Sequence, residues 1–492
     1  MIYQNIEGLI EQALKMELIE TADVHYVRNQ VLNLLRLNSF PEAVENPTID
    51  TIPNILDALL SFSIEQGIIE NVLDEKEILS ANIMNCFVAR PSIINEIFYQ
   101  KYEESPKAAT DYFYNLSKNS NYIQMNRIQK NISFKAETSY GEMDITINLS
   151  KPEKDPEQIK RERAMKQTGN YPKCLLCVEN EGYAGRTGYP ARANHRIIHV
   201  PLLEENWYLQ YSPYVYYNEH SILLSEEHRD MKINRNTFER LLTFIDKFPH
   251  YFIGSNADLP IVGGSILSHD HYQAGRYEFP MMKAEDAFTF ELTDFPEVAA
   301  SVVKWPMSVI RLKGEVISDL VHAAEHILDA WRHYSDPIAD IIAFTDDTPH
   351  NTITPIAQFR DEKFELDLVL RNNRTSIEHP LGIFHPHADV QHIKKENIGL
   401  IEVMGLAVLP PRLKDELKEI KNYLLGNAGD IPEHHQTWAE QLKETYHLVA
   451  TDEEAEEIIK NELGQKYARI LEDAGVLKER TVFERFIHTL NK

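Results

Sequence analysis

The spacing of apolar residues changes near residue 130, and this change limits the folds open to the chain. Before it, apolar residues recur three and four positions apart, as in Ile6, Leu9 and Ile10, which indicates helices. After it, apolar and polar residues alternate at 132–136 and 143–147, which is typical of strands. A helical region followed by strands with interspersed helices predicts an α+β protein with helices packed on an antiparallel sheet core.

The chain of 492 residues is too long for one ordinary core, since roughly 150 residues per domain is usual. Helical and strand-like segments followed by a His-x-His segment occur twice in the same order, which indicates an internal duplication. We therefore predict four parts, namely a helical N-terminal region 1–125, a first half 126–300, a second half 301–410 and a helical C-terminal tail 411–492.

The charge balance and the cysteine count limit the partners and the compartment. Fifty basic and seventy-six acidic side chains give a formal charge of −26, which disfavours nucleic acid and anionic membrane surfaces as partners. Three cysteines in a chain of this length indicate a reducing, cytoplasmic setting. The N-terminus has no basic region typical of a signal peptide, and we expect no membrane span.

The segment Ser268-His269-Asp270-His271-Tyr272-Gln273 contains the residues best suited to chemistry. If it is a strand, the side chains of His269, His271 and Gln273 face one side. A neutral imidazole is a good nucleophile near pH 7, and its attack on phosphorus would give a phosphoramidate. The alternative is that these histidines are surface residues or metal ligands.

The loop before this segment is rich in glycine. Residues 255–265 include Gly263, Gly264 and Ser265. Glycines allow a close approach of the backbone to a ligand and leave N–H groups for phosphate oxygens. We therefore expect this loop to bind a phosphate.

Two further patterns suit metal ions. Cys174 and Cys177 have the spacing of half a zinc site, and His228 and His269 are the candidates to complete it. The alternative is a pair of buried thiols.

The segment His385-Pro386-His387 has three possible roles, namely a second metal pair, a phosphate contact or a purely structural element, and His350 is close enough in sequence to join it. Lys394 and Lys395 bring positive charge near these histidines, as an anionic substrate would require, although adjacent lysines are usually a solvated face.

Three stretches together carry a family resemblance that covers nearly the whole chain. They are CLLCVEN at 174–180, GSILSHDHYQ at 264–273 and GIFHPHADVQH at 382–392. The chain resembles the type 2, longer bacterial branch of the galactose-1-phosphate uridylyltransferases, which belong to the histidine-triad superfamily. That resemblance implies two histidine-triad-like halves. Hydrolases of the superfamily carry His-x-His-x-His, whereas transferases carry His-x-His-x-Gln, and Gln273 places this chain with the transferases.

The resemblance implies a reaction and its residues. UMP would pass from UDP-glucose to galactose 1-phosphate through a uridylylated His271, giving glucose 1-phosphate and UDP-galactose. Gln273 would orient a phosphate oxygen, while Asn256 and Ser265 would contact the nucleotide. A homodimer is the family expectation. The type 1 branch carries a Gln-Arg-Asp motif that is replaced here near 408–410, so the residues that select the hexose stay unassigned.

The resemblance also implies two metal sites. The zinc ligands would be Cys174, Cys177, His228 and His269. A second divalent metal would use Glu285, His350, His385 and His387.

Two rival hypotheses stay open from the sequence. One is a histidine-triad phosphorylase or hydrolase of dinucleoside polyphosphates. The other is a zinc-stabilised binding protein whose histidines serve only as ligands.

Overall fold

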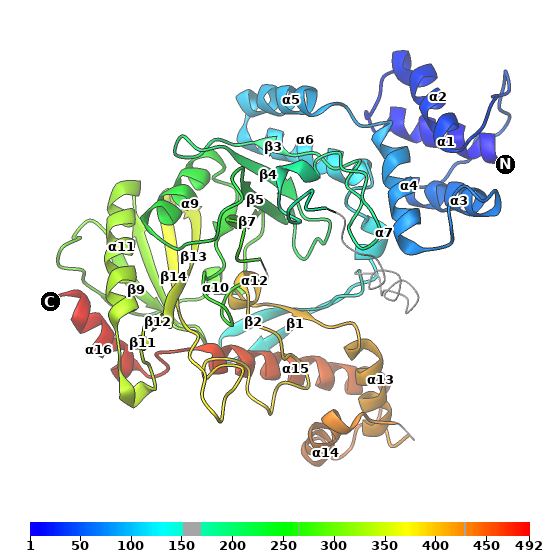
Figure 1. Cartoon of the computed structure of the whole chain (residues 1–492). Coiled ribbons are helices and arrows are strands. Elements are labelled where there is room, and N and C mark those ends of the chain that lie inside the picture. The colour runs from blue at the N-terminus through cyan, green and yellow to red at the C-terminus, as the bar shows by residue number, and fades with distance from the viewer. Residues whose placement is uncertain (151–168, 265, 428–429) are drawn as a thin grey trace. The chain divides into compact units, whose positions relative to one another are not determined.

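A computed structural model of the chain combines helices with sheets that are mostly antiparallel (Figure 1), which confirms the predicted α+β class. The structure describes residues 1–150, 169–264, 266–427 and 430–492. None of the helices within these ranges is long and apolar enough to cross a lipid bilayer.

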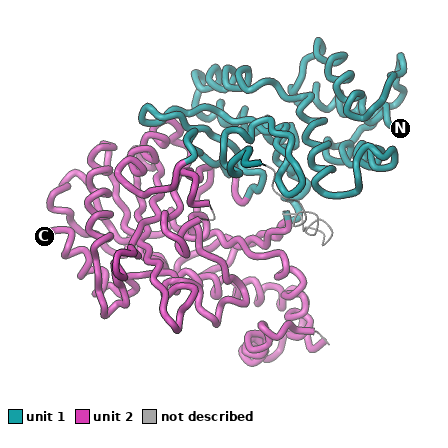
Figure 2. Tube along the Cα trace, in the orientation of Figure 1, with its two compact units in different colours: residues 1–130, 150–215, 219–228 teal, residues 131–149, 216–218, 229–492 magenta. Residues whose placement is uncertain are grey.

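The contacts within the chain separate it into two compact units (Figure 2). Both units are assembled from segments that are distant in sequence, so the predicted division into four consecutive parts stays a prediction. Unit 1 comprises residues 1–130, 150–215 and 219–228, and unit 2 comprises residues 131–149, 216–218 and 229–492.

Unit 1 begins with helices, as the apolar spacing predicts. Ile6, Leu9 and Ile10 are buried in a core that the first four helices share. Ser105 ends one helix and caps the next, because its hydroxyl accepts the N–H of Ala108 at 3.1 Å. The helices are α1 (Ile2–Lys15), η1 (Thr21–Asp23), α2 (Val24–Leu34), α3 (Ile52–Glu65), α4 (Leu73–Asn85), α5 (Pro91–Glu104), α6 (Pro106–Asn119) and α7 (Met125–Ile128).

The remaining part of unit 1 contains a short antiparallel arrangement of strands. In it, Leu209 pairs with Ile198 on one side and with Leu223 on the other, and all three side chains are apolar and buried. The elements are η2 (Val178–Asn180), β3 (Ile198–His199), β4 (Trp207–Tyr211) and β5 (Ser221–Ser225).

Seven strands of unit 2 lie in the order β7, β6, β13, β14, β10, β9, β8, with antiparallel neighbours. Helices α9 (Arg235–Lys247) and α11 (Ile317–His333) pack against each other and against this sheet. The strands are β6 (Phe252–Gly254), β7 (His271–Gly275), β8 (Asp286–Phe290), β9 (Ala299–Val303), β10 (Val309–Gly314), β13 (Asn351–Arg360) and β14 (Lys363–Asn372). Shorter elements between them are α10 (Pro280–Lys283), η3 (Pro337–Ala339), β11 (Phe344–Thr345) and β12 (Thr348–Pro349).

A second sheet of unit 2 joins distant parts of the sequence. Strands β1 (Ile132–Thr138) and β2 (Gly141–Ile147) form a hairpin, and β15 (Leu406–Leu409) pairs with β2 in parallel. The short helix α12 (Leu400–Val403) leads into β15.

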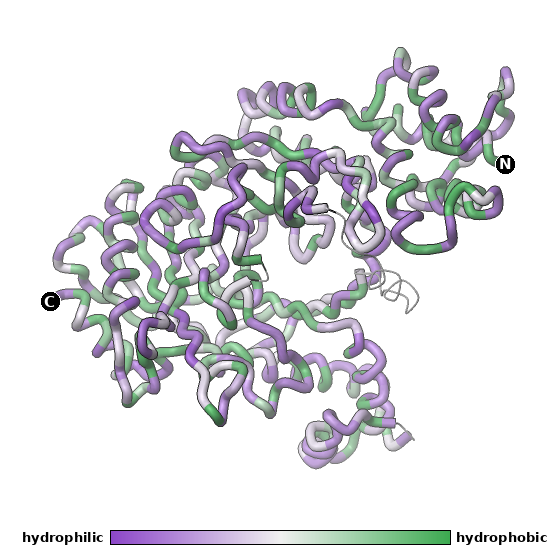
Figure 3. The backbone as a smooth tube through the Cα atoms, viewed as in Figure 1, coloured by the Kyte–Doolittle hydropathy of each residue, from purple (hydrophilic) through white to green (hydrophobic). Residues whose placement is uncertain are grey.

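The tail is helical, as predicted. Hydrophilic and hydrophobic residues alternate along its helices (Figure 3), as expected for helices with one buried face. Ala455, Leu463 and Tyr467 of the longest helix are buried. The elements are α13 (Leu413–Leu424), η4 (Glu433–His435), α14 (Gln436–Thr445), α15 (Asp452–Ala474) and α16 (Arg480–Leu490).

Candidate functional site

His271 is the first residue of β7, which pairs with β6 so that Gly254 lies opposite Gln273. Side chains alternate along a strand, so His271 and Gln273 share one face and Tyr272 lies on the other. His269 precedes the strand, and the expected alternation therefore applies to His271 and Gln273 only. His271 is 7% exposed, whereas Gln273 is half-buried.

The ring of His271 is held in one tautomer. Its Nδ1 lies 2.7 Å from the carbonyl oxygen of His269. A carbonyl can only accept, so Nδ1 carries the proton and donates it, and the Nε2 of a neutral ring keeps its lone pair. Burial lowers the pKa of His271 to about 4. The imidazole is therefore neutral at physiological pH, as a nucleophile must be.

Residues on either side of His271 fix the start of β7. Asp270 accepts from the Arg229 guanidinium at 3.2 Å, and its backbone N–H donates to the Arg229 carbonyl at 2.8 Å. Tyr272 is buried, and its hydroxyl accepts from Nη1 of Arg240 at 3.3 Å. No sequence pattern predicted roles for Arg229, Arg240 or Asp270.

The glycine loop packs tightly against itself. A Cβ on Gly263 would lie 2.5 Å from the Ala257 carbonyl oxygen, and one on Gly264 would lie 2.8 Å from Nδ2 of Asn256. Gly263 thus requires glycine for packing because it meets backbone atoms, whereas a Cβ at Gly264 would displace the Asn256 side chain. Oδ1 of Asn256 accepts the N–H of Leu400 at 2.9 Å, which ties the loop to the start of α12. Ser265 lies outside the described residues.

Three of the four predicted zinc ligands come together in unit 1. The two sulfur atoms of Cys174 and Cys177 are 3.5 Å apart, and the Cys177 sulfur lies 3.2 Å from Nδ1 of His228. Asn180 closes the turn, because its amide donates to the carbonyls of Cys174 and Cys177, at 2.8 Å in each case. His269, the fourth predicted ligand, belongs to unit 2 and is fully buried.

The residues predicted for a second metal do not gather in the described parts of the chain, where they form no group of three close ligand atoms. Glu285 is exposed. His350 is engaged elsewhere, with Nδ1 2.8 Å from Oδ1 of Asn373 and Nε2 2.8 Å from Oγ1 of Thr345.

The His385-Pro386-His387 segment packs near the glycine loop instead. Nε2 of His387 donates to the Ile383 carbonyl at 3.0 Å, and burial lowers the pKa of His385. A Cβ on Gly382 would lie 3.0 Å from Ile261 of the loop and 3.0 Å from the Cβ of His385.

The two adjacent lysines differ in environment. Lys395 is exposed, in line with a solvated face. Lys394 is buried and forms an ion pair with Glu402 of α12. Lys394 is thus part of the support for the helix that holds Asn256.

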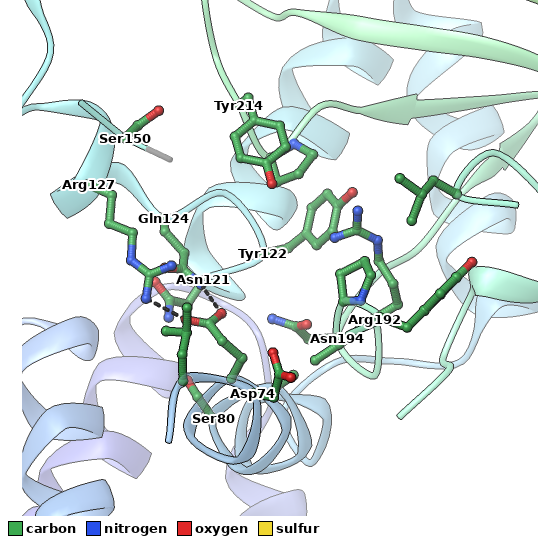
Figure 4. A pocket seen from close by; sticks show the side chains of 18 of the residues that line it. Asp74, Ser80, Asn121, Tyr122, Gln124, Arg127, Ser150, Arg192, Asn194 and Tyr214 are labelled. Atoms are coloured by element: carbon green, nitrogen blue, oxygen red, sulfur yellow. Dashed lines mark hydrogen bonds and ion pairs between the residues drawn. The ribbon is translucent and has the colours of Figure 1, made fainter. Parts of the chain in front are cut away.

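Unit 1 also contains a cavity of about 400 Å³ that sequence reasoning did not single out (Figure 4). Tyr122 and Tyr214 line it, together with Arg192, whose guanidinium carbon lies 5.5 Å from the centre of the Tyr122 ring. Arg127, also in its wall, is ion-paired with Glu77. The cavity offers aromatic faces and one guanidinium that has no carboxylate partner among the described residues.

Comparison with known proteins places the chain in a family. Residues 17–230 match the N-terminal domain of galactose-1-phosphate uridyl transferase, and residues 240–440 match its C-terminal domain. The chain belongs to the galactose-1-phosphate uridyl transferase family. Its motifs at 174–180 and 264–273 fall one in each matched domain.

Similar proteins of the family match it over nearly their whole length. The galactose-1-phosphate uridylyltransferase of Clostridium perfringens (strain 13) is 53% identical over 492 residues, covering 99% of this chain and 98% of that protein. That of Fusobacterium nucleatum is 52% identical, with 98% of each chain covered. Among solved structures, a yeast Ap4A phosphorylase matches at 13% identity and a TM-score of 0.35, over 67% of this chain and 90% of that chain. This score is too low to inform fold or function.

Proposed function

We propose that the protein transfers UMP from UDP-glucose to galactose 1-phosphate, with His271 as the residue that carries the uridylyl group. The main support is the held tautomer of His271, whose Nδ1 donates to the His269 carbonyl at 2.7 Å and whose Nε2 lone pair is available for attack. Family membership and the names of the relatives supply the substrates.

The transfer proceeds in two successive displacements at the same phosphorus atom. In the first, Nε2 of His271 attacks the α-phosphorus of UDP-glucose, the bond to the bridging oxygen breaks, and glucose 1-phosphate leaves with the electron pair. In the second, a phosphate oxygen of galactose 1-phosphate attacks the same phosphorus, and the P–N electron pair returns to Nε2. The hydrogen bond from Nδ1 to the His269 carbonyl stabilises the positive charge on the uridylylated ring in between.

Label exchange tests this covalent route. The protein is incubated with UDP-glucose and labelled glucose 1-phosphate, without galactose 1-phosphate. We expect label to enter UDP-glucose, because the first step is reversible and complete in itself. If label enters only when galactose 1-phosphate is present, the two substrates react directly and no uridylyl-histidine forms.

Gln273 shares a face of β7 with His271, and we propose that its amide donates to a non-bridging phosphate oxygen. Gln273→Ala should slow the exchange by roughly 10²–10³-fold, as loss of one donor to a developing anion does elsewhere. Gln100→Ala, exposed on α5, is the control and should leave the rate unchanged. An unaltered rate in Gln273→Ala would remove the amide from the mechanism.

We also propose that Cys174, Cys177, His228 and His269 bind zinc. Two thiolates and two imidazoles are a typical tetrahedral donor set for structural zinc. The turn closed by Asn180 already presents both sulfur atoms on one side, 3.5 Å apart. A zinc ion bound there would cross-link the ligands and would leave no open position for catalysis. In a Co²⁺ derivative this site should show thiolate-to-metal charge transfer that Cys174→Ser/Cys177→Ser loses.

The family also suggests a homodimer and a cytoplasmic setting, and we propose both. Three cysteines in a chain of 492 residues are few for a protein that relies on disulfides, which suits a reducing compartment. Light scattering of the purified chain should give twice the mass of 56.9 kDa.

A further inference from the structure

Three histidines and one glutamate gather in the C-terminal part of unit 2, apart from all the ligands discussed so far. Glu416 lies on α13, His434 and His435 lie in η4, and His392 lies on the segment before α12; Figure 1 shows α13 and α14. Nε2 of His434 lies 3.4 Å from Oε1 of Glu416, and Nε2 of His435 lies 2.9 Å from its Oε2. One carboxylate therefore faces two imidazoles.

These separations fit one metal ion. In a tetrahedral zinc site with bonds of about 2.0–2.1 Å, neighbouring donor atoms lie roughly 3.3 Å apart. The two distances, 2.9 and 3.4 Å, reach different oxygens of the Glu416 carboxylate and lie on either side of that value. With one ligand atom from each residue, all three atoms lie within 4.8 Å of one another. The His435 side chain is fully buried, whereas that of His434 is 47% exposed, so water can reach the open side and complete the coordination.

His392 lies behind His435, where a supporting residue is needed. The two Nδ1 atoms are 2.7 Å apart, so one of them carries a proton and donates a hydrogen bond to the other. In the absence of metal, His435 donates from Nε2 to Glu416 and accepts at Nδ1 from His392. With a metal on Nε2, the proton of His435 moves to Nδ1 and is donated to His392, whose own proton moves to Nε2. The two rings keep two protons in both states, and a metal-bound histidine usually has such an acceptor behind it.

Arg412 is the cation that competes for this place. Its Nη1 lies 2.5 Å from Oε2 of Glu416 and 3.4 Å from Nε2 of His434. Its Nη2 also donates to the His392 carbonyl at 2.9 Å, and its side chain is 40% exposed, so Nη1 can turn away from Glu416 when another cation binds. An ion pair whose arginine is this exposed is weak and does not outweigh three ligand bonds.

We propose that Glu416, His434 and His435 bind one divalent transition-metal ion of the zinc class, with His392 as the acceptor behind His435. Imidazole and carboxylate donors without sulfur suit Zn²⁺, Co²⁺ and Ni²⁺ better than Mg²⁺ or Ca²⁺. The ion joins α13 to η4 and, through His392, to the segment that precedes α12. This site is independent of the transferase reaction, and it stabilises the tail rather than acting on substrate.

Titration of the metal-free, full-length protein with Co²⁺ tests the site. The Cys174→Ser/Cys177→Ser variant should still bind one Co²⁺, with visible d–d bands and no thiolate charge transfer. Wild type should bind one Co²⁺ ion more than Glu416→Gln or His434→Ala. This comparison keeps both cysteines, so it remains valid if the cysteine variant does not fold. Equal stoichiometry in wild type and in both ligand variants would overturn the proposal.

Further variants separate a metal site from a hydrogen-bond network. His392→Ala should weaken Co²⁺ binding about 10–100-fold, as loss of an acceptor behind a ligand does. Arg412→Gln should tighten it roughly twofold to fivefold, since it removes the competing ion pair. His447→Ala, exposed in the same tail, is the matched control and should change nothing. If Arg412→Gln weakens binding instead, the cluster is a network that needs its arginine, and the proposal fails.

The metal site and the transferase reaction can fail separately. Label exchange should persist in His434→Ala. Absence of label exchange in wild type would refute the transferase reaction and leave the metal site untouched.

Discussion

Replacing His271 with alanine should reduce label exchange between UDP-glucose and glucose 1-phosphate by on the order of 10⁴-fold or more, because removal of a covalent nucleophile leaves only binding to act on the substrate. Both half-reactions pass through Nε2 of this residue, and alanine offers no atom that can form the bond to phosphorus. Mass spectrometry of wild type mixed with UDP-glucose should find a uridylyl group on the peptide that contains His271. The same peptide of His271→Ala should stay unmodified.

The matched control is His333→Ala, an exposed histidine on α11 that takes no part in the proposed reaction. It should retain wild-type exchange and binding. Thermal unfolding of His271→Ala should stay near that of wild type, since the ring makes a single hydrogen bond within the described part of the chain, to the His269 carbonyl. A uridylyl group found on a different peptide, with exchange intact in His271→Ala, would assign the nucleophile elsewhere.

Much of the site was predictable because local patterns determine it. Strand alternation places His271 and Gln273 on one face once β7 begins at His271. Strands β13 and β14 likewise form a hairpin through 360–363, with Asp361 and Glu362 both at positive φ, as a type I′ turn requires. Both results depend on residues that are close in sequence.

Long-range contacts account for what sequence reasoning missed. The parallel pairing of Leu406 with Asp144 joins strands that are far apart in the chain, and no local pattern specifies such a partner. The ion pair between Asp270 and Arg229 likewise joins two residues that are far apart in the sequence, so it depends on the tertiary fold. Gly263 and Gly264 were predicted to serve phosphate binding, whereas the contact with the Ala257 carbonyl shows that packing alone requires glycine at 263, and Gly264 also leaves room for the Asn256 side chain.

The sheet of unit 2 that contains His271 also holds a buried ion pair. Arg311 of β10 and Asp367 of β14 are each 2% exposed, and they meet through two hydrogen bonds of 2.7 and 2.8 Å. Arg311 also donates to the carbonyls of Met281 at 3.1 Å and Ala284 at 3.2 Å, which fixes α10 after β7. Four of the five guanidinium N–H groups thus donate hydrogen bonds in a place that is nearly closed to water.

Arg311→Met should lower the free energy of unfolding of unit 2 by about 3–5 kcal/mol, because it leaves the Asp367 carboxylate buried without a counter-charge. Urea unfolding followed by tryptophan fluorescence measures this, since Trp305, Trp331 and Trp438 all lie in unit 2. The double variant Arg311→Met/Asp367→Leu should lose less unfolding free energy than the single variant, because no charge is left without a partner.

Arg480→Met is the control. Its ion pair with Glu484 is exposed, with side-chain exposures of 66% and 51%, and its loss should cost under about 1 kcal/mol. If Arg311→Met costs no more than this control, or if the double variant is the less stable of the two, then desolvation of a stranded charge is not what makes this pair matter.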